Sequence, residues 1–113
     1  MGRRCIWMLQ RYITKLFQYE EKIGLLIGSS SLHDLRRYID GSQEAFYMCG
    51  YSDVRDALCS KWEDYVENYY HSTATCGWDN LITKNAVDKK DSIRMYFSLL
   101  RSYLQEYYPE IIV

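Results

Sequence analysis

The side chains that could do chemistry are concentrated at positions 61–70, which read KWEDYVENYY. This stretch holds three carboxylates, three tyrosines and a tryptophan. Carboxylates one helical turn apart, such as Glu63 and Glu67, could act as a general acid and base, or could attract a basic partner. Because paired carboxylates on a polar helix face are more commonly just solvated, a binding or solubilising role is favoured over catalysis.

Nucleophilic catalysis is the other chemistry that the residue types allow. His71 and Cys76 share one polar segment, but no third group is placed to orient the histidine. No phosphate-binding, nucleophile-elbow or metalloprotease motif is present. We therefore expect no enzymatic activity, although a hydrolase or transferase with an unrecognised site stays open.

The cysteines indicate neither a disulfide framework nor a metal centre. None of them forms a C-x-x-C pair, and neither histidine has ligand spacing to a cysteine. We expect reduced thiols that pack as small hydrophobic side chains, with no bound metal or cofactor. The four cysteines are Cys5, Cys49, Cys59 and Cys76.

The elements that position these residues are predicted to be helices. One proline and six glycines in 113 residues are too few for a turn-rich β fold, and apolar residues recur with a helical period. The sequence predicts an all-α fold with one compact domain over residues 1–113. About five helices are expected, over residues 4–22, 31–49, 53–70, 78–86 and 88–108, with capping pairs at Ser31/Asp34 and Asp88/Asp91.

A continuous helix over residues 53–70 would place aromatic and acidic side chains on opposite sides. At 100° per residue, its inward face would carry Val54, Leu58, Trp62, Tyr65 and Tyr69. Its outward face would carry Asp56, Glu63 and Glu67, with Asp53 and Asp64 flanking them and Tyr70 at the border, and these six are the candidate partner-binding residues. We expect Trp62 to be buried against the last helix, and the acidic face to meet a positively charged partner.

Charge is distributed unevenly along the chain, although the formal net charge is only −1. Residues 38–80 hold two Lys/Arg and eight Asp/Glu, whereas residues 1–37 hold seven Lys/Arg and three Asp/Glu. The basic segment supports an alternative function, a small nucleic-acid-binding regulator, but no nucleic-acid motif accompanies it. The residues that could contact phosphates are Arg3, Arg4, Arg11, Lys15, Arg36 and Arg37.

Hydropathy indicates a cytoplasmic protein. No apolar run approaches the ~18 residues that a membrane span needs. The start MGRRCIWML has an apolar run of five residues, which is too short for a secretory signal. We expect no membrane association and a monomer in the free state. The apolar tail EIIV could be docked on the core or loose.

From about residue 23 to residue 107, the chain resembles small bacterial immunity proteins of contact-dependent growth inhibition and related polymorphic toxin systems. Four segments carry the resemblance: GLLIGSSSLHDLRRYIDG, KWEDYVENYY, TCGWDNLI and DKKDSIRMYFSLLRSYLQEY. They resemble, in order, the glycine- and serine-containing entry to a helix, a central acidic helix with a tryptophan, a Ser/Thr-Gly-Trp element, and a final helix with an aromatic-x-x-Leu-Leu core.

The resemblance implies a binding function without catalysis. Such proteins bind the toxin domain of a cognate effector and block its active site or substrate path. Many of these toxins are nucleases with a basic substrate groove, where an acidic helix would mimic phosphate. The expected partner is therefore a cognate toxin domain, a basic nuclease, and no nucleic acid is bound directly.

Overall fold

The computed structural model describes residues 5–73 and 76–113, and every regular element in them is helical. The elements in chain order are α1 (Trp7–Gln18), α2 (Gly24–Ile27), α3 (Leu32–Met48), α4 (Asp53–Leu58), α5 (Ser60–Tyr70), α6 (Trp78–Asn85) and α7 (Lys89–Tyr107). The prediction of an all-α fold with about five helices is confirmed. The additional elements are the single turn α2 and a division of the predicted third helix into α4 and α5.

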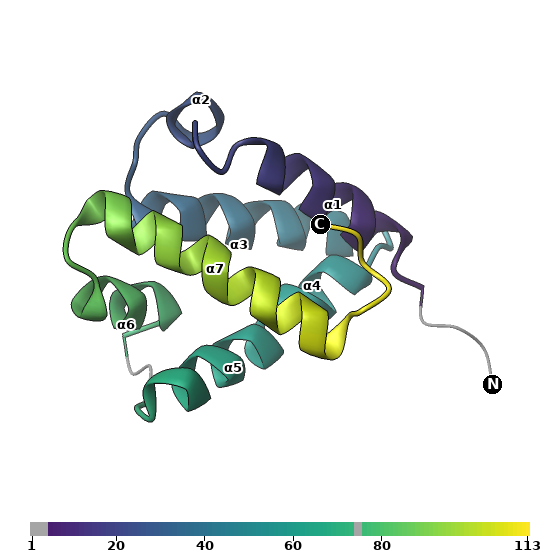
Figure 1. Cartoon of the computed structure of the whole chain (residues 1–113). Helices are drawn as coiled ribbons and strands as arrows, with labels where there is room; N and C mark the ends of the chain where they lie inside the picture. Colours follow the sequence, from purple (N-terminus) through teal and green to yellow (C-terminus); the bar gives the residue numbers. More distant parts are fainter. Residues whose placement is uncertain (1–4, 74–75) are drawn as a thin grey trace.

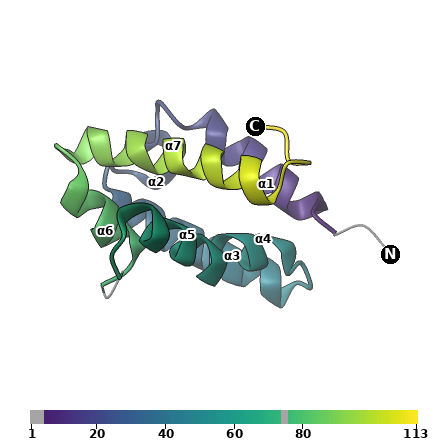
Figure 2. The ribbon, with the colours of Figure 1, turned by 60° about the horizontal axis from the view of Figure 1, so that its bottom comes forward.

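The helices form two layers, and the long helix α7 crosses in front of the others in Figure 1. Helices α1 and α7 lie on one side of the molecule, and α3, α4, α5 and α6 lie on the other (Figure 2). The Cα radius of gyration is 13.7 Å, close to the roughly 13 Å expected for one compact domain of this length. The chain therefore buries one shared core between the two layers.

The core is aromatic at its centre. Trp62 is 1% exposed, and its ring centroid lies 5.4 Å from that of Tyr96, 5.5 Å from Tyr103 and 5.7 Å from Trp78. All three contacts are edge-to-face, the geometry that aligns the positive ring edge with a neighbouring negative face. The predicted burial of Trp62 against the last helix is confirmed.

The prediction of one helix over residues 53–70 is wrong, because the backbone breaks at Cys59 (φ −102°, ψ −111°). The carbonyl of Ala57 accepts a 2.5 Å hydrogen bond from the buried hydroxyl of Tyr103. A continuous helix would offer that carbonyl to the backbone N–H of Lys61 instead. The tertiary hydrogen bond therefore replaces a helical one, and the helix axis changes direction between α4 and α5.

The two predicted helix caps have different outcomes. Asp88 accepts from the N–H of Asp91 at 2.8 Å, and Asp91 accepts from the N–H of Val87 at 2.9 Å, so the second capping pair is confirmed. Ser31 occupies the N-cap position of α3, but its side chain makes no capping bond. The side chain of Asp34 instead accepts from the hydroxyl of Ser29 at 2.7 Å. The predicted Ser31 capping box is therefore wrong.

The C-terminal tail is docked on α1. The side chain of Gln10 accepts from the N–H of Ile112 and donates to its carbonyl, both at 2.8 Å. Ile111 is only 7% exposed and belongs to the core. The side-chain amide of Gln10 therefore satisfies both backbone groups of Ile112, as the backbone of a neighbouring β-strand would.

The predicted packing of the cysteines is wrong. All four cysteines are free thiols, as expected, but all are exposed rather than buried. Cys49, for example, is the C-cap residue of α3, just beyond its last helical residue. Tyr69, assigned to the inward face, is 49% exposed because it lies in the last turn of α5.

Candidate partner-binding surface

Helix α5 is anchored to the molecule along one side only. Trp62 and Val66 are its fully buried residues, and they lie one helical turn apart. The helix packs on α4, α6 and α7 and lies at the edge of its layer (Figure 2). Its other side is thus directed to solvent.

Three carboxylates of α5 lie outside its buried stripe: Asp64 is exposed, and Glu63 and Glu67 beside it are half-buried. Positions 63 and 67 are about 40° apart around the helix, and positions 64 and 67 about 60°. Within the described part of the chain, no Lys or Arg lies within ion-pair distance of Glu63 or Asp64. We call these three residues the α5 acidic face.

The basic residue of α5 is turned away from this face. The ammonium of Lys61 lies 4.9 Å from the ring centroid of Tyr107 and 4.7 Å from that of Tyr108. These are cation–π distances, so the rings hold the ammonium on the α7 side of the helix. Its positive charge is therefore drawn toward α7 and does not screen the acidic face locally.

The remaining predicted acidic residues do not share the α5 acidic face, because they lie on α4, beyond the break at Cys59. Asp56 is exposed in the first turn of α4. Asp53 has a different role: its carboxylate accepts a 2.7 Å hydrogen bond from the N–H of Leu9. That N–H is one of the unsatisfied donors of the first turn of α1, which holds no acidic residue of its own. Asp53 thus caps α1 from another helix.

Tyr70 adjoins the acidic face at the C-terminal end of α5 and is half-buried. Its ring contacts that of Tyr69 edge-to-face, with the centroids 4.9 Å apart. Burial, and then the neighbouring Tyr69, raises the pKa of Tyr70. The hydroxyl of Tyr70 therefore remains a hydrogen-bond donor at neutral pH.

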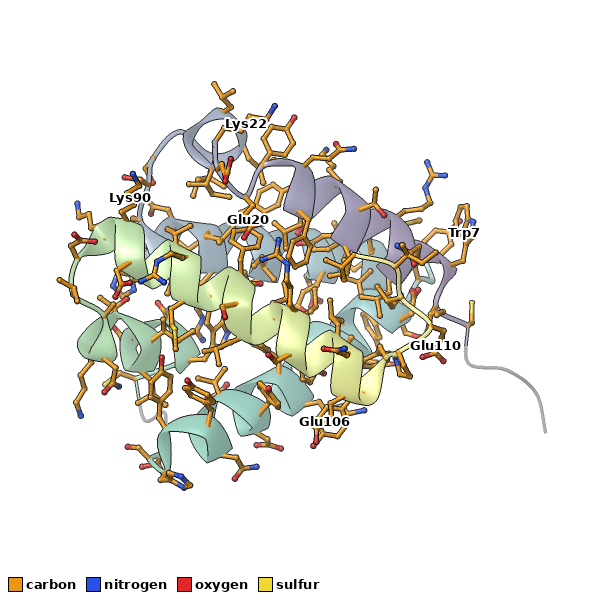
Figure 3. The ribbon with its side chains drawn as sticks, viewed as in Figure 1. Trp7, Glu20, Lys22, Lys90, Glu106 and Glu110 are labelled. Carbon is orange, nitrogen blue, oxygen red and sulfur yellow. The ribbon has the colours of Figure 1, made fainter. Side chains whose placement is uncertain are left out.

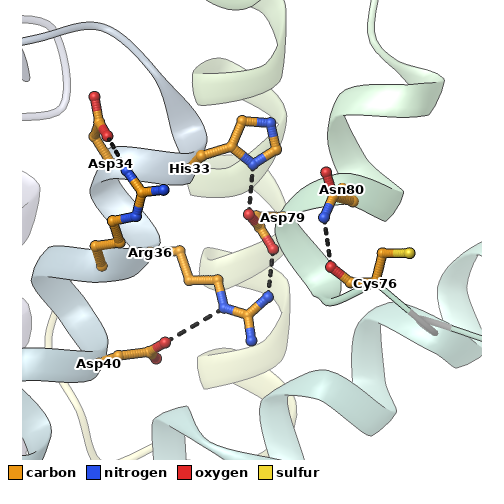
Figure 4. Close-up of polar contacts among 8 residues, drawn as sticks. His33, Asp34, Arg36, Asp40, Cys76, Asp79 and Asn80 are labelled. Atoms are coloured by element: carbon orange, nitrogen blue, oxygen red, sulfur yellow. Dashed lines mark hydrogen bonds and ion pairs between the residues drawn. The ribbon is translucent and has the colours of Figure 1, made fainter.

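A second polar cluster, which the sequence analysis did not identify, is centred on Asp79 (Figure 4). Asp79 is 5% exposed at the start of α6. One of its carboxylate oxygens lies 2.5 Å from Nδ1 of His33, and the other accepts from Arg36 at 2.5 Å. Both partners come from α3, so the cluster joins α6 to α3.

The surroundings of Asp79 favour its ionised form. Burial alone would raise the pKa of Asp79, but the hydrogen bonds from His33 and Arg36 outweigh burial and lower it. Arg36 extends over the ring of Trp78, 5.9 Å from its centroid, and lies against the α-carbon of Gly77. Gly77 has φ +98°, a region that residues with a side chain rarely adopt. Glycine therefore provides both the turn and the room for the guanidinium.

One sequence signal could have indicated this cluster. Asp79 lies about 60° around the helix from Ile82, which is fully buried, so a carboxylate falls inside the apolar sector of α6. A buried carboxylate requires hydrogen-bond or charge partners. The pattern does not say which of the chain's cations provides them, because the partners lie more than 40 residues away in the sequence.

The basic residues of the alternative function are not gathered in one place. Arg36 binds Asp79, and Arg37 binds Asp34 at 3.0 Å. Arg11 and Lys15 lie on α1. Arg3 and Arg4 lie outside the described residues. The cations therefore divide between intramolecular ion pairs on α3 and a separate surface on α1.

The described residues also define which other site types can be considered. In residues 5–73 and 76–113, no group of three or more His, Cys, Asp or Glu side chains is arranged to hold a metal ion. None of the helices described is both long enough and apolar enough to cross a bilayer. Comparisons of the chain with protein-family models, curated proteins and solved structures find no match.

Proposed function

We propose that this protein is an immunity protein, which binds a cognate nuclease toxin domain and blocks its active site or substrate path. The observation that carries this proposal is the α5 acidic face. Two of its carboxylates, on Glu63 and Asp64, have no basic partner in the described part of the chain, and Lys61 is turned toward Tyr107 and Tyr108.

Several other acidic residues have internal roles. Asp53 caps α1, Asp79 is buried and binds Arg36 and His33, and Asp91 completes the cap of α7. Leaving like charges together on one helix face costs stability through repulsion. A basic partner would remove that repulsion on binding, which supports a role in recognition.

The proposed mechanism is electrostatic mimicry of a nucleic-acid backbone. A nuclease groove that binds phosphates presents Lys and Arg, and three carboxylates on one helix face would complement them. Such complementarity raises the association rate by orders of magnitude, and this rate enhancement decreases as the salt concentration rises. Tyr70 would supply a contact of the kind found at interface hot spots, an aromatic ring with a hydrogen-bond donor.

The Asp79–His33 pair is better explained by folding than by catalysis. A buried carboxylate that orients a histidine is also part of hydrolytic triads, in which the histidine activates a nucleophile. His33 lines neither the groove between α1 and α3 nor the smaller hollow beside α6. The second oxygen of Asp79 binds Arg36, so the carboxylate is shared between two side chains of α3 and joins that helix to α6.

The proposal is tested by co-expression with the C-terminal domain of the secreted effector encoded beside this chain in its genome. The two proteins are expected to co-purify as a complex, and the complex should weaken steeply as salt rises. The proposal would be abandoned if the neighbouring gene encodes no secreted effector, or if the two proteins purify separately at low salt.

A further inference from the structure

A second surface of the molecule has the features of a binding groove. Helices α1 and α3 run in opposite directions (Figure 1), and an open groove of about 710 Å³ lies between them. Met8, Tyr12 and Phe46 contribute apolar surface to it. The rings of Tyr12 and Phe46 meet edge-to-face with centroids 6.0 Å apart, which gives the groove a packed wall.

The groove is basic as well as apolar. Arg11 and Lys15 line it, one helical turn apart on α1, and none of its lining residues is acidic. Helix α1 contains no Asp or Glu from Trp7 to Gln18. Within the described residues, no carboxylate lies within ion-pair distance of Arg11 or Lys15. These two positive charges therefore remain available to a partner.

Exposed aromatic rings extend the groove at one end. Trp7 is 56% exposed and Tyr51 is 41% exposed, with ring centroids 6.1 Å apart. The guanidinium of Arg11 lies 5.1 Å from the ring centroid of Trp7, so the groove and the aromatic pair are joined. Trp7 projects from the start of α1, away from the bundle (Figure 3). Trp, Tyr, Arg and Met are the residue types enriched at protein interfaces.

We propose that this groove binds an amphipathic helix of a partner protein, with acidic residues beside its apolar stripe. From Trp7 to Lys15 the groove follows about two helical turns, roughly 12 Å, which suits partner side chains at i, i+4 and i+7. The apolar stripe would contact Met8 and Phe46, and the carboxylates would pair with Arg11 and Lys15. This surface is separate from the α5 acidic face and does not depend on the proposed function.

Charge favours a peptide over a nucleic acid as the occupant. A nucleic-acid strand brings a phosphate with every nucleotide, and binding it requires a row of cations along the backbone. Only Arg11 and Lys15 among the lining residues are cations, and the chain as a whole has a formal charge of −1. The carboxylates of a helix with two or three acidic residues can pair with these two cations. Its apolar stripe then contacts the apolar residues of the groove.

The test selects from a phage-displayed library of random peptides of about 16 residues, roughly four helical turns. The wild-type protein is expected to enrich sequences with helical apolar spacing and flanking Asp or Glu. A selected peptide should bind at least about tenfold more weakly to the Arg11→Glu, Lys15→Glu double variant, about 1.4 kcal/mol. The matched control, Lys89→Glu with Lys90→Glu, changes the same charge at the exposed start of α7 and should bind normally.

Two further measurements make the outcome decisive. Trp62 and Trp78 are buried, so a change in tryptophan emission that is lost in Trp7→Phe places the peptide at the groove. A thymidine oligonucleotide should not displace it. The proposal is overturned if no peptide is enriched, if the enriched peptides lack acidic residues or bind the double variant equally, or if the oligonucleotide occupies the groove instead.

Discussion

Asp79 is the residue whose surroundings depart most from an ordinary surface carboxylate. It is buried at the start of α6, and it is held between His33 and Arg36 of α3. Its lowered pKa means that the ionised form of Asp79 is favoured more in the folded chain than in the unfolded chain. Ionisation of Asp79 therefore stabilises the fold at neutral pH.

Replacing Asp79 with asparagine should lower the free energy of unfolding by about 1–3 kcal/mol at neutral pH, because Arg36 and His33 lose their charged hydrogen-bond partner. A depressed folded pKa gives stability that is present above the unfolded value and lost as pH falls through the folded one. The difference between Asp79→Asn and wild type should therefore shrink below about pH 4. Urea unfolding at a series of pH values measures both effects.

Asp40→Asn is the control for this substitution, since Asp40 is an exposed carboxylate 3.4 Å from the same arginine. It should change stability by less than about 0.5 kcal/mol. Equal losses in the two variants would mean that burial of Asp79 contributes nothing to the interaction.

Gly77 and Gly41 offer a matched pair of glycine substitutions. A methyl group on Gly77 would collide with the guanidinium of Arg36, and its φ of +98° is already unfavourable for alanine. The guanidinium could move only by leaving Asp79, so Gly77→Ala should be clearly destabilising. Gly41 lies inside α3 with no atom within 4 Å of the added methyl group, and Gly41→Ala should stabilise by about 0.4–1 kcal/mol. Thermal melting of both variants checks the opposite signs.

At the scale of elements, the break between α4 and α5 matters most. Their residues read as one helix in the sequence, because Val54, Leu58, Trp62 and Val66 keep a four-residue spacing across the break. Local spacing carries no information about Tyr103, which lies 46 residues from the carbonyl that it binds. Tertiary hydrogen bonds of this kind override a helical pattern, so the break could not be predicted from the sequence.

The same distinction explains which parts of the candidate site could be predicted. The outward direction of Glu63, Asp64 and Glu67 follows from the burial of Trp62 and Val66 in one helix, and helical period alone predicts it. The capping role of Asp53 and the pairing of Asp79 depend on which helices meet. The packing of the whole core determines these helix–helix contacts, and no short motif encodes them.

Asp53 provides a test at the element scale. Asp53→Ala removes the carboxylate that accepts from the N–H of Leu9, and α1 has no acidic residue in its first turn to replace it. The free energy of unfolding should fall by about 1 kcal/mol, the usual cost of losing an N-cap. Hydrogen exchange should quicken most in the first turn of α1. If only α4 is affected, Asp53 acts within its own helix and does not cap α1.

At the scale of the whole molecule, the two candidate binding surfaces have opposite charge and lie on different helices. The α5 acidic face belongs to one layer, and the cations of the groove belong to α1 in the other (Figure 2). The net charge of −1 hides this separation. Under both proposals, the α5 acidic face would bind a basic toxin, and the groove between α1 and α3 would remain open for an acidic partner.

The most direct test of the proposed function is toxin binding by Glu63→Lys with Asp64→Lys. Glu67 is left unchanged because it also takes part in an interaction within the chain. Asp64 is exposed and Glu63 is half-buried, and neither pairs with a Lys or Arg of the described residues, so native helicity and melting should be retained. Affinity for the cognate toxin domain should fall at least about tenfold, or 1.4 kcal/mol, and protection of cells should fail.

The matched control, Glu21→Lys with Glu44→Lys, makes the same change of charge away from α5 and should protect fully. Full protection by the α5 variant, with unchanged affinity, would contradict the central claim that this face binds the toxin.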